Sequence, residues 1–175
     1  MDKIARREKQ MQSCLPWLFK DRPGTVLYIG ANAEMHTALG LLQQAGHEVT
    51  VLEAWPENAE WVQQSGLADI VVQGDVRKLD ELPLEDTYDI VIWFHGPEHV
   101  EETEFIPTLN TLEQRGTVVV LGAPWGKTPQ QPGVQPFERH LSGHWPDDWK
   151  QLGYATDTLP PENVPGGNLM GWKWT

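Results

Sequence analysis

Short apolar runs alternate with amphipathic stretches along most of the chain. Five runs rich in valine, isoleucine and leucine have the length of a β-strand. They are "TVLYIG" (25–30), "EVTVLEA" (48–54), "ADIVVQGD" (68–75), "YDIVIWF" (88–94) and "GTVVVLGAPWG" (116–126). Because almost every position in these runs is apolar, both faces of each strand are expected to be buried, as in a parallel sheet covered by helices.

The stretches between these runs carry apolar residues at helical spacing. We expect helices at residues 3–19, 34–46, 56–66, 101–113 and 146–152, the first of them within an N-terminal helical region of residues 1–22. Proline opens the helix at Pro56 and glycine ends two others, at Gly46 and Gly66, as is usual at these positions. Strands that alternate with helices predict a doubly wound α/β sheet with helices on both faces and right-handed crossovers.

The pattern changes after the fifth strand. Residues 127–144 form a loop rich in proline and glutamine, which we expect to be mobile without ligand and to act as a lid. Two extended pieces, 154–160 and 168–174, predict a hairpin on the edge of a mostly parallel, seven-stranded sheet. We find no internal repeat, so residues 1–175 are expected to form a single domain.

Composition narrows the classes of partner and compartment. The net charge of −12 disfavours binding to nucleic acid, whose backbone is also negative. No apolar run reaches the ~20 residues that span a bilayer, and no apolar stretch of a signal peptide follows the basic start, so no membrane association is expected. The single cysteine, Cys14, excludes an internal disulfide and favours a reducing, cytoplasmic location.

Candidate binding residues follow directly after the predicted strands. A ligand of an open α/β sheet binds outside the carboxyl ends of its strands. In strand order these positions are Gly30, Ala31 and Asn32, then Glu53, Ala54 and Trp55, then Asp75 and Val76, and finally Trp93 and His95.

The ordered set of strand ends resembles the class I S-adenosylmethionine-dependent methyltransferases, in particular their small seven-stranded members. The resemblance covers residues 24–175 and is carried by "VLYIGAN", "VTVLEA", "GDVRKL", "YDIVIWFHGPEHV", "GTVVVLGAPWG" and "HLSGHWPDDWKQLGY". It implies a Rossmann-like methyltransferase fold, S-adenosylmethionine as cofactor and a small-molecule methyl acceptor, in a monomer or homodimer. Two alternatives remain: an inactive binding or scaffold protein of this fold, and another enzyme that uses S-adenosylmethionine.

The resemblance assigns roles around the cofactor. Glu53 is expected to accept hydrogen bonds from the ribose hydroxyls, and its alternative is a surface charge at a strand end. Trp55 is expected to flank the adenine. Asp75, with the amide of Val76, is expected to meet the adenine amino group, and the alternative for Asp75 is a helix cap.

The first loop departs from the pattern of the family. Tyr28 replaces the usual acidic residue, and of the expected glycines only Gly30 is clear. Asn32 can replace the second glycine because asparagine tolerates positive φ, and Glu34 is a candidate for the missing charge. One glycine does not make the G-x-G-x-x-G of a pyrophosphate site, which disfavours a dinucleotide cofactor.

The stretch "HGPEH" (95–99) matches H-x-x-E-H, a zinc-peptidase motif. In such motifs the histidines project from one helix, and Gly96-Pro97 makes a helix across His95 and His99 unfavourable. We therefore expect no metal, but a loop that leaves the fourth strand and a helix that starts near Glu98. His95 is expected to be the general base of methyl transfer. Second choices are His99, His140 and His144, and Trp93, Trp125 and Trp145 are candidate walls for the acceptor.

Overall fold

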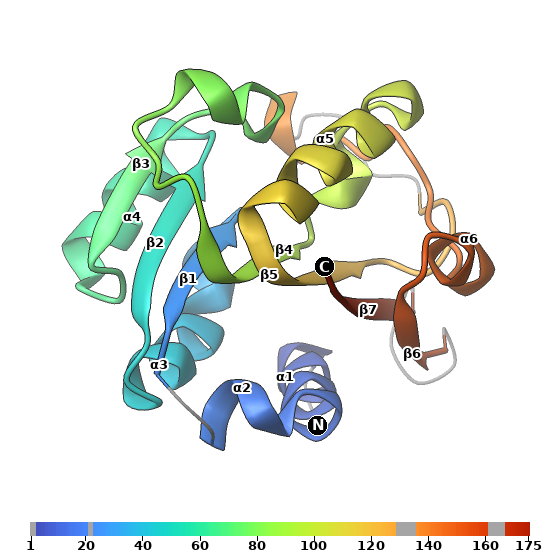
Figure 1. The fold of residues 1–175 in the computed structure, drawn as a ribbon, viewed down its shortest axis with the longest axis horizontal. Helices are drawn as coiled ribbons and strands as arrows, with labels where there is room; N and C mark the ends of the chain where they lie inside the picture. Colours follow the sequence, from blue (N-terminus) through green and yellow to red (C-terminus); the bar gives the residue numbers. More distant parts are fainter. Residues whose placement is uncertain (1–2, 21–22, 129–135, 161–166) are drawn as a thin grey trace.

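The centre of the molecule is a seven-stranded sheet in the order β3-β2-β1-β4-β5-β7-β6 (Figure 1). The computed structural model describes residues 3–20, 23–128, 136–160 and 167–175. The strands are β1 Thr25–Ile29, β2 Glu48–Glu53, β3 Ile70–Gln73, β4 Tyr88–Phe94, β5 Gly116–Ala123, β6 Ala155–Leu159 and β7 Asn168–Trp174. Strands β1 to β5 pair in parallel, while β7 runs antiparallel to both β5 and β6. This confirms the doubly wound α/β sheet and the hairpin at its edge.

Helices cover both faces of the sheet. The α-helices are α1 Lys3–Cys14, α2 Pro16–Lys20, α3 His36–Gln44, α4 Pro56–Ser65, α5 Glu102–Arg115 and α6 Pro146–Gln151. The short 3₁₀ helices are η1 Ala33–Met35, η2 Val76–Glu81, η3 Pro97–His99 and η4 Pro136–Glu138. Successive residues of β1 point to opposite faces, so Leu27 packs with the layer of α5 and α6, and Tyr28 with the layer of α1 to α4.

The expected first helix is broken, so that prediction was wrong in its length. Helix α1 ends at Cys14, and Pro16 begins α2. Proline has no amide hydrogen, and its ring clashes with the carbonyl one turn earlier, which explains why the helix stops before it. Leu15 and Leu18 are nevertheless fully buried, because the break turns α2 onto the sheet.

The segment after β4 also differs from the prediction. Residues 97–99 form only the 3₁₀ turn η3, so no α-helix starts near Glu98, whereas α5 begins at Glu102 and confirms the helix predicted for residues 101–113. The expected helix 34–46 likewise begins as the 3₁₀ turn η1 before α3.

Part of the expected lid can be located. Residues 129–135 lie outside the described residues, so a mobile lid stays a prediction. The last part of the segment is attached to η3, because the Leu141 amide donates to the Glu98 carbonyl at 2.7 Å. Its end pairs with the β5 exit, where the Gly126 amide donates to the His144 carbonyl at 2.7 Å. Among the described residues, no helix has both the length and the apolar composition needed to cross a bilayer.

Candidate functional site

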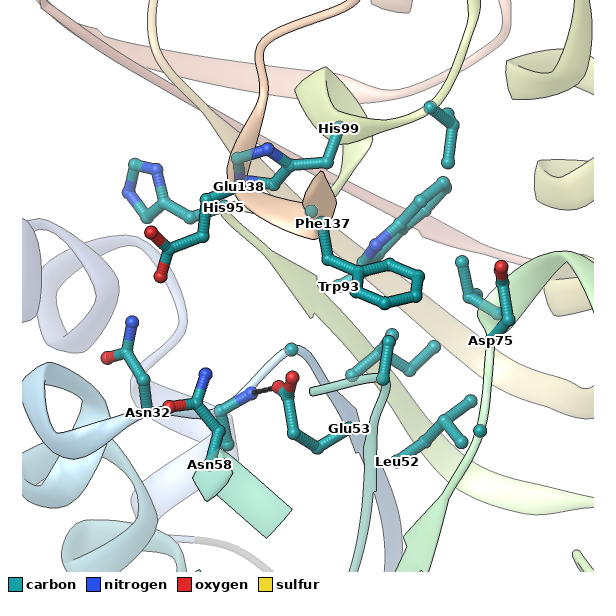
Figure 2. Close-up of a pocket in the computed structure, with 18 of the residues that line it drawn as sticks. Asn32, Leu52, Glu53, Asn58, Asp75, Trp93, His95, His99, Phe137 and Glu138 are labelled. Carbon is teal, nitrogen blue, oxygen red and sulfur yellow. Dashed lines mark hydrogen bonds between the residues drawn. The ribbon is translucent and has the colours of Figure 1, made fainter. Parts of the chain in front are cut away.

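An open pocket lies at the carboxyl ends of β1 to β4, where the sequence predicts a ligand (Figure 2). All but one of the predicted cofactor and catalytic residues line it: Gly30, Ala31, Asn32, Glu53, Ala54, Asp75, Val76, Trp93 and His95. The exception is Trp55. In Figure 2, Glu53, Asn32 and Asn58 lie on one side of the pocket, and His95, His99, Phe137 and Glu138 lie on the other. The fold therefore brings the predicted residues together.

The loop after β1 turns at a single glycine. Gly30 has φ +79°, in the left-handed region that favours glycine, and its amide donates to the Leu52 carbonyl at 3.0 Å. Asn32 follows in the pocket wall but does not adopt positive φ, so the expectation that it replaces the second glycine in that conformation was wrong. Its carbonyl accepts from the Met35 amide at 2.9 Å at the start of the helical segment. Tyr28 is fully buried under this loop, against Phe94. The side chain of Glu34, the candidate for the missing charge, lies outside the described residues.

The Glu53 carboxylate joins the first two strand ends. It is 7% exposed, so the alternative of a surface charge is wrong. Its two oxygens accept hydrogen bonds from the backbone amides of Ala31, at 2.9 Å, and Trp55, at 2.7 Å. Burial raises the pKa of this carboxyl above its ordinary 4.5, although the hydrogen bonds from Trp55, Ala31 and Asn58 oppose the rise. Glu53 is therefore a buried carboxylate in the pocket wall that is fixed by hydrogen bonds from both strand ends.

Asp75 has the capping role that the sequence analysis gave as its alternative. Its Oδ1 accepts from the Arg77 backbone amide at 2.9 Å, at the start of η2. The Arg77 guanidinium also contacts both carboxylate oxygens, at 2.9 Å from Nε to Oδ1 and 2.5 Å from Nη2 to Oδ2. Burial raises the pKa of Asp75, but the hydrogen bonds and charge of Arg77 outweigh it and hold the pKa below its ordinary 3.8. Asp75 therefore stays ionised in the pocket wall.

His95 occupies a strained backbone position at the end of β4. It is the only described residue other than glycine with positive φ, at +50°. Its amide donates to the Gly122 carbonyl at 2.7 Å, which holds the turn in place. The imidazole Nδ1 lies 3.3 Å from Oε1 of Glu98. Strained residues that the surrounding structure enforces are frequent at functional sites, and this one faces the pocket.

Glu98 is the most deeply buried acid of the site. It is 2% exposed and is surrounded by the imidazoles of His95, His99 and His140, at 3.3, 3.8 and 4.0 Å. Burial alone would raise the pKa of its carboxyl, but the hydrogen bond from His95 and the charges of His95 and His99 lower it to about 2. Glu98 is thus a buried carboxylate that holds the His95 ring.

The second-choice histidines are placed differently from one another. His99 lines the pocket beside His95, whereas His140 and His144 do not. His144 is 5% exposed, and its Nε2 lies 3.1 Å from the Ser142 hydroxyl. Burial lowers the pKa of His144, which makes it a neutral core residue.

Of the three tryptophans expected to form walls for the acceptor, only Trp93 lines the pocket. Trp93 lines the pocket floor and stacks on Phe105, with ring centroids 6.0 Å apart. Trp125 and Trp145 do not line this pocket, so their role as walls for the acceptor stays a prediction. They lie in a separate shallow depression beside α6. Whether a tryptophan after a strand reaches the pocket depends on the path of its loop, which the residue type alone does not predict.

Several pocket residues escaped the sequence analysis. Phe137 and Glu138, from η4, close the pocket opposite Glu53 (Figure 2). Trp55 packs against Phe137 with ring centroids 6.3 Å apart, so its ring supports this wall from behind. Asn58 and Arg77 stand shortly after the ends of β2 and β3, so they could have been predicted as pocket residues from their positions in the sequence. Phe137 and Glu138 had no such signal, because they stand in a long loop.

Comparisons with known proteins give the class of the fold. No family profile and no curated protein sequence matches the chain. Solved structures do match. A SAM-dependent methyltransferase from Archaeoglobus fulgidus aligns over 97% of this chain and 94% of its own, with a TM-score of 0.64 and 15% identity.

Two further structures contain a bound product of the cofactor. Magnesium protoporphyrin IX methyltransferase from Synechocystis PCC 6803, with bound SAH, aligns over 96% of this chain and 83% of its own, with a TM-score of 0.66 and 17% identity. The 1,6-didemethyltoxoflavin-N1-methyltransferase of Burkholderia thailandensis, with bound S-adenosylhomocysteine, aligns over 97% and 76%, with a TM-score of 0.63 and 14% identity. The chain therefore has the Rossmann-like fold of the class I SAM-dependent methyltransferases.

Proposed function

We propose that the protein is an S-adenosylmethionine-dependent methyltransferase that acts on a small molecule. The observation that carries the proposal is the buried Glu53 carboxylate at the end of β2, inside a pocket bounded by four parallel strand ends. An acid in this place suits the two hydroxyls of a ribose. The similar structures support the proposal, because two of them hold S-adenosylhomocysteine.

The order of the strand ends supports one direction for the bound cofactor. From β3 through β2 and β1 to β4, the pocket presents Asp75, Glu53, the Gly30 loop and His95 in turn. The adenine would lie between Asp75 and the amide of Val76, and the ribose on Glu53. The methionine end would lie along Gly30, Ala31, Asn32 and Ala54, with Trp93 beneath. Trp55 would act through Phe137, whose ring it supports.

In this orientation the methyl transfer would take place beside His95. In methyl transfer an acceptor heteroatom attacks the sulfonium methyl carbon, a new bond to carbon forms, and the electron pair of the broken carbon–sulfur bond stays on sulfur. A hydroxyl or amine acceptor also releases a proton. His95 is positioned to take it, and the Glu98 carboxylate holds the imidazole by its Nδ1 atom. This is the arrangement by which a buried carboxylate orients a catalytic histidine in hydrolases.

Calorimetric titration with S-adenosylmethionine and S-adenosylhomocysteine tests the proposal. We expect one site per chain for both ligands. Glu53→Ala should weaken binding by about 1.5–3 kcal/mol, the range for hydrogen bonds to a charged group. Glu57→Ala, an exposed acid on α4, is the matched control and should bind as the unmodified protein does.

Other outcomes would overturn the proposal. Binding of neither ligand by folded protein would favour the scaffold interpretation, for which the single-glycine first loop is the supporting feature. Binding of both ligands with an unchanged affinity in Glu53→Ala would remove Glu53 from the site. Binding with turnover of S-adenosylmethionine to products that carry no transferred methyl group would favour another enzyme that uses this cofactor.

A further inference from the structure

The histidine cluster around Glu98 contains more than the proposed methyl transfer uses. Glu98 is 2% exposed, and among the described residues its Oε2 has no hydrogen-bond partner. One ligand atom each from Glu98, His99 and His140 lies within 4.8 Å of the other two. His99 and His140 come from segments 41 positions apart and meet only in the fold. A buried carboxylate with an unpartnered oxygen requires compensating positive charge.

Both outer histidines are oriented from behind by backbone carbonyls. Nδ1 of His99 lies 3.1 Å from the Arg139 carbonyl oxygen, and Nδ1 of His140 lies 2.6 Å from that of Thr128. A carbonyl oxygen only accepts hydrogen bonds, so each Nδ1 carries the hydrogen. The Nε2 atoms therefore face the Glu98 carboxylate with a lone pair when the rings are neutral. Histidines that bind a metal ion are oriented in this way, by a partner on the other ring nitrogen.

The spacing fits a shared ion better than direct hydrogen bonds. From Nε2 of His99 and His140 to Oε1 of Glu98 the distances are 3.8 and 4.0 Å. Hydrogen bonds between nitrogen and oxygen usually measure about 2.7–3.2 Å, and a contact beyond about 3.6 Å is not one. Two ligands of one tetrahedral zinc ion, each about 2.0–2.2 Å from it, lie about 3.4 Å apart. A small inward movement of two partly exposed rings is enough to reach that separation.

We propose that Glu98, His99 and His140 bind a divalent transition-metal ion. Two imidazoles and one carboxylate form a donor set that suits zinc. The set is distinct from the peptidase motif in the sequence, since His95 is not a ligand and His140 replaces it. The sequence expectation of no metal rested on the absence of a helix across residues 95–99, and this site does not need that helix.

Three protein ligands leave one coordination position open, as in catalytic zinc sites. Of the three ligands only His99 lines the pocket, next to His95, so an ion held here would lie at the end of the pocket assigned to the acceptor. If the proposed function holds, on which this step rests, an acceptor oxygen or sulfur would bind there. The ion would lower the pKa of that group and so favour acceptors that lose a proton.

The binding of Zn²⁺ and Co²⁺ to chelator-treated, untagged protein tests the site directly. We expect one equivalent of Zn²⁺ per chain, and Co²⁺ should give the intense visible absorption of a four-coordinate ion. His140→Ala and Glu98→Gln should each lower the affinity at least 100-fold. His36→Ala is the matched control, because His36 is an exposed histidine on α3, and it should leave the affinity unchanged.

Two results would overturn the proposal. One is the absence of stoichiometric binding by the unmodified protein; the other is equal affinity in His140→Ala, with its fold verified by circular dichroism. Because Glu98 is buried, the Co²⁺ spectrum of the unmodified protein is a second readout that needs no substitution. A six-coordinate spectrum would also contradict the site.

The same experiments separate this inference from the proposed function. S-adenosylhomocysteine titration is done with and without Zn²⁺. Cofactor binding without metal binding would contradict only the metal site. Metal binding at Glu98, His99 and His140 in a chain that binds neither S-adenosylmethionine nor its product would contradict only the methyltransferase assignment.

Discussion

His95 combines a strained backbone with a side chain that faces the pocket. Its φ of +50° is costly for any residue with a Cβ atom, and only glycine adopts it freely. The chain nevertheless keeps histidine there, with its Nδ1 on the Glu98 carboxylate. Glycine at residue 95 would relieve the backbone strain, so the presence of histidine there indicates a function for its side chain.

A pair of substitutions at His95 separates strain from function. Both His95→Ala and His95→Gly lose the imidazole, and we expect methyl transfer to fall about 10²–10⁴-fold in both, as for a lost general base. Only glycine relieves the positive φ, so His95→Gly should be more stable than His95→Ala by about 1 kcal/mol. Urea unfolding measures the difference. Equal stability of the two variants would contradict the assignment of strain.

The burial of Glu53 predicts how stability and cofactor affinity depend on pH. Because the pKa of this carboxyl is raised above 4.5, the folded chain favours the protonated form. Its contribution to stability therefore increases as pH falls from neutrality through the raised pKa, and levels off below the unfolded value. Affinity for S-adenosylhomocysteine should move the opposite way, since protonation removes an acceptor for the ribose.

Glu53→Gln tests both trends at once. In the unmodified protein, affinity should fall as the pH is lowered from neutrality toward the ordinary value of 4.5, while the contribution of this carboxyl to stability rises. Glu53→Gln should show neither dependence, and Glu57→Gln, at an exposed position, should show both as before. Titrations of ligand and of urea over this range provide the data, and a pH-independent affinity in the unmodified protein would count against the ribose role.

At the scale of elements, the N-terminal helix is tied to the far edge of the sheet by one glutamine. Gln10 on α1 donates from Nε2 to the Asp157 carboxylate on β6 at 2.7 Å. Its Oε1 accepts from the Asn168 side chain on β7 at 2.8 Å. Gln10 and Asn168 are both 5% exposed, so the hydrogen bond between them is shielded from water, and the one to Asp157 is part-buried.

Removal of the bridge should destabilise the whole fold. Gln10→Ala leaves the buried Asn168 amide without this partner, which costs about 1–3 kcal/mol. Gln12→Ala, an exposed position on the same helix, is the control for helix propensity and should change stability by less than about 0.5 kcal/mol. Urea unfolding of both variants decides the matter, and equal midpoints would show that α1 is held by apolar packing alone.

The elements themselves were largely predictable. The five apolar runs locate β1 to β5, because burial in a covered parallel sheet shows in the residues of each run, and the two extended pieces at the end of the chain locate β6 and β7. The ends of elements were less predictable. Pro16 divides the first helix, and the 3₁₀ turn η3 stands where a helix start near Glu98 was expected, although proline and glycine in those segments already indicated breaks.

At the scale of the whole molecule, the order of the parallel strands determines most of the pocket. Residues that directly follow a strand come to one edge of the sheet by topology, and for this reason Gly30, Glu53, Asp75 and His95 could be named from the sequence. The pairing of the strands then arranges these four residues across the pocket in the spatial order β3, β2, β1, β4. The fold class follows from the same alternation of strands and helices.

The sequence by itself thus determined the sheet, its helices and the residues at the strand ends, because these depend on local periodicity and on chain topology. Only the tertiary structure decided which groups reach the pocket from a distance. Phe137 and Glu138 close it, and His140 meets Glu98, because hydrogen bonds from the Leu141 and Ser142 amides attach their loop to the Glu98 carbonyl. Such contacts depend on the path of a loop with no periodic pattern, so nothing in the order of its residues specifies them.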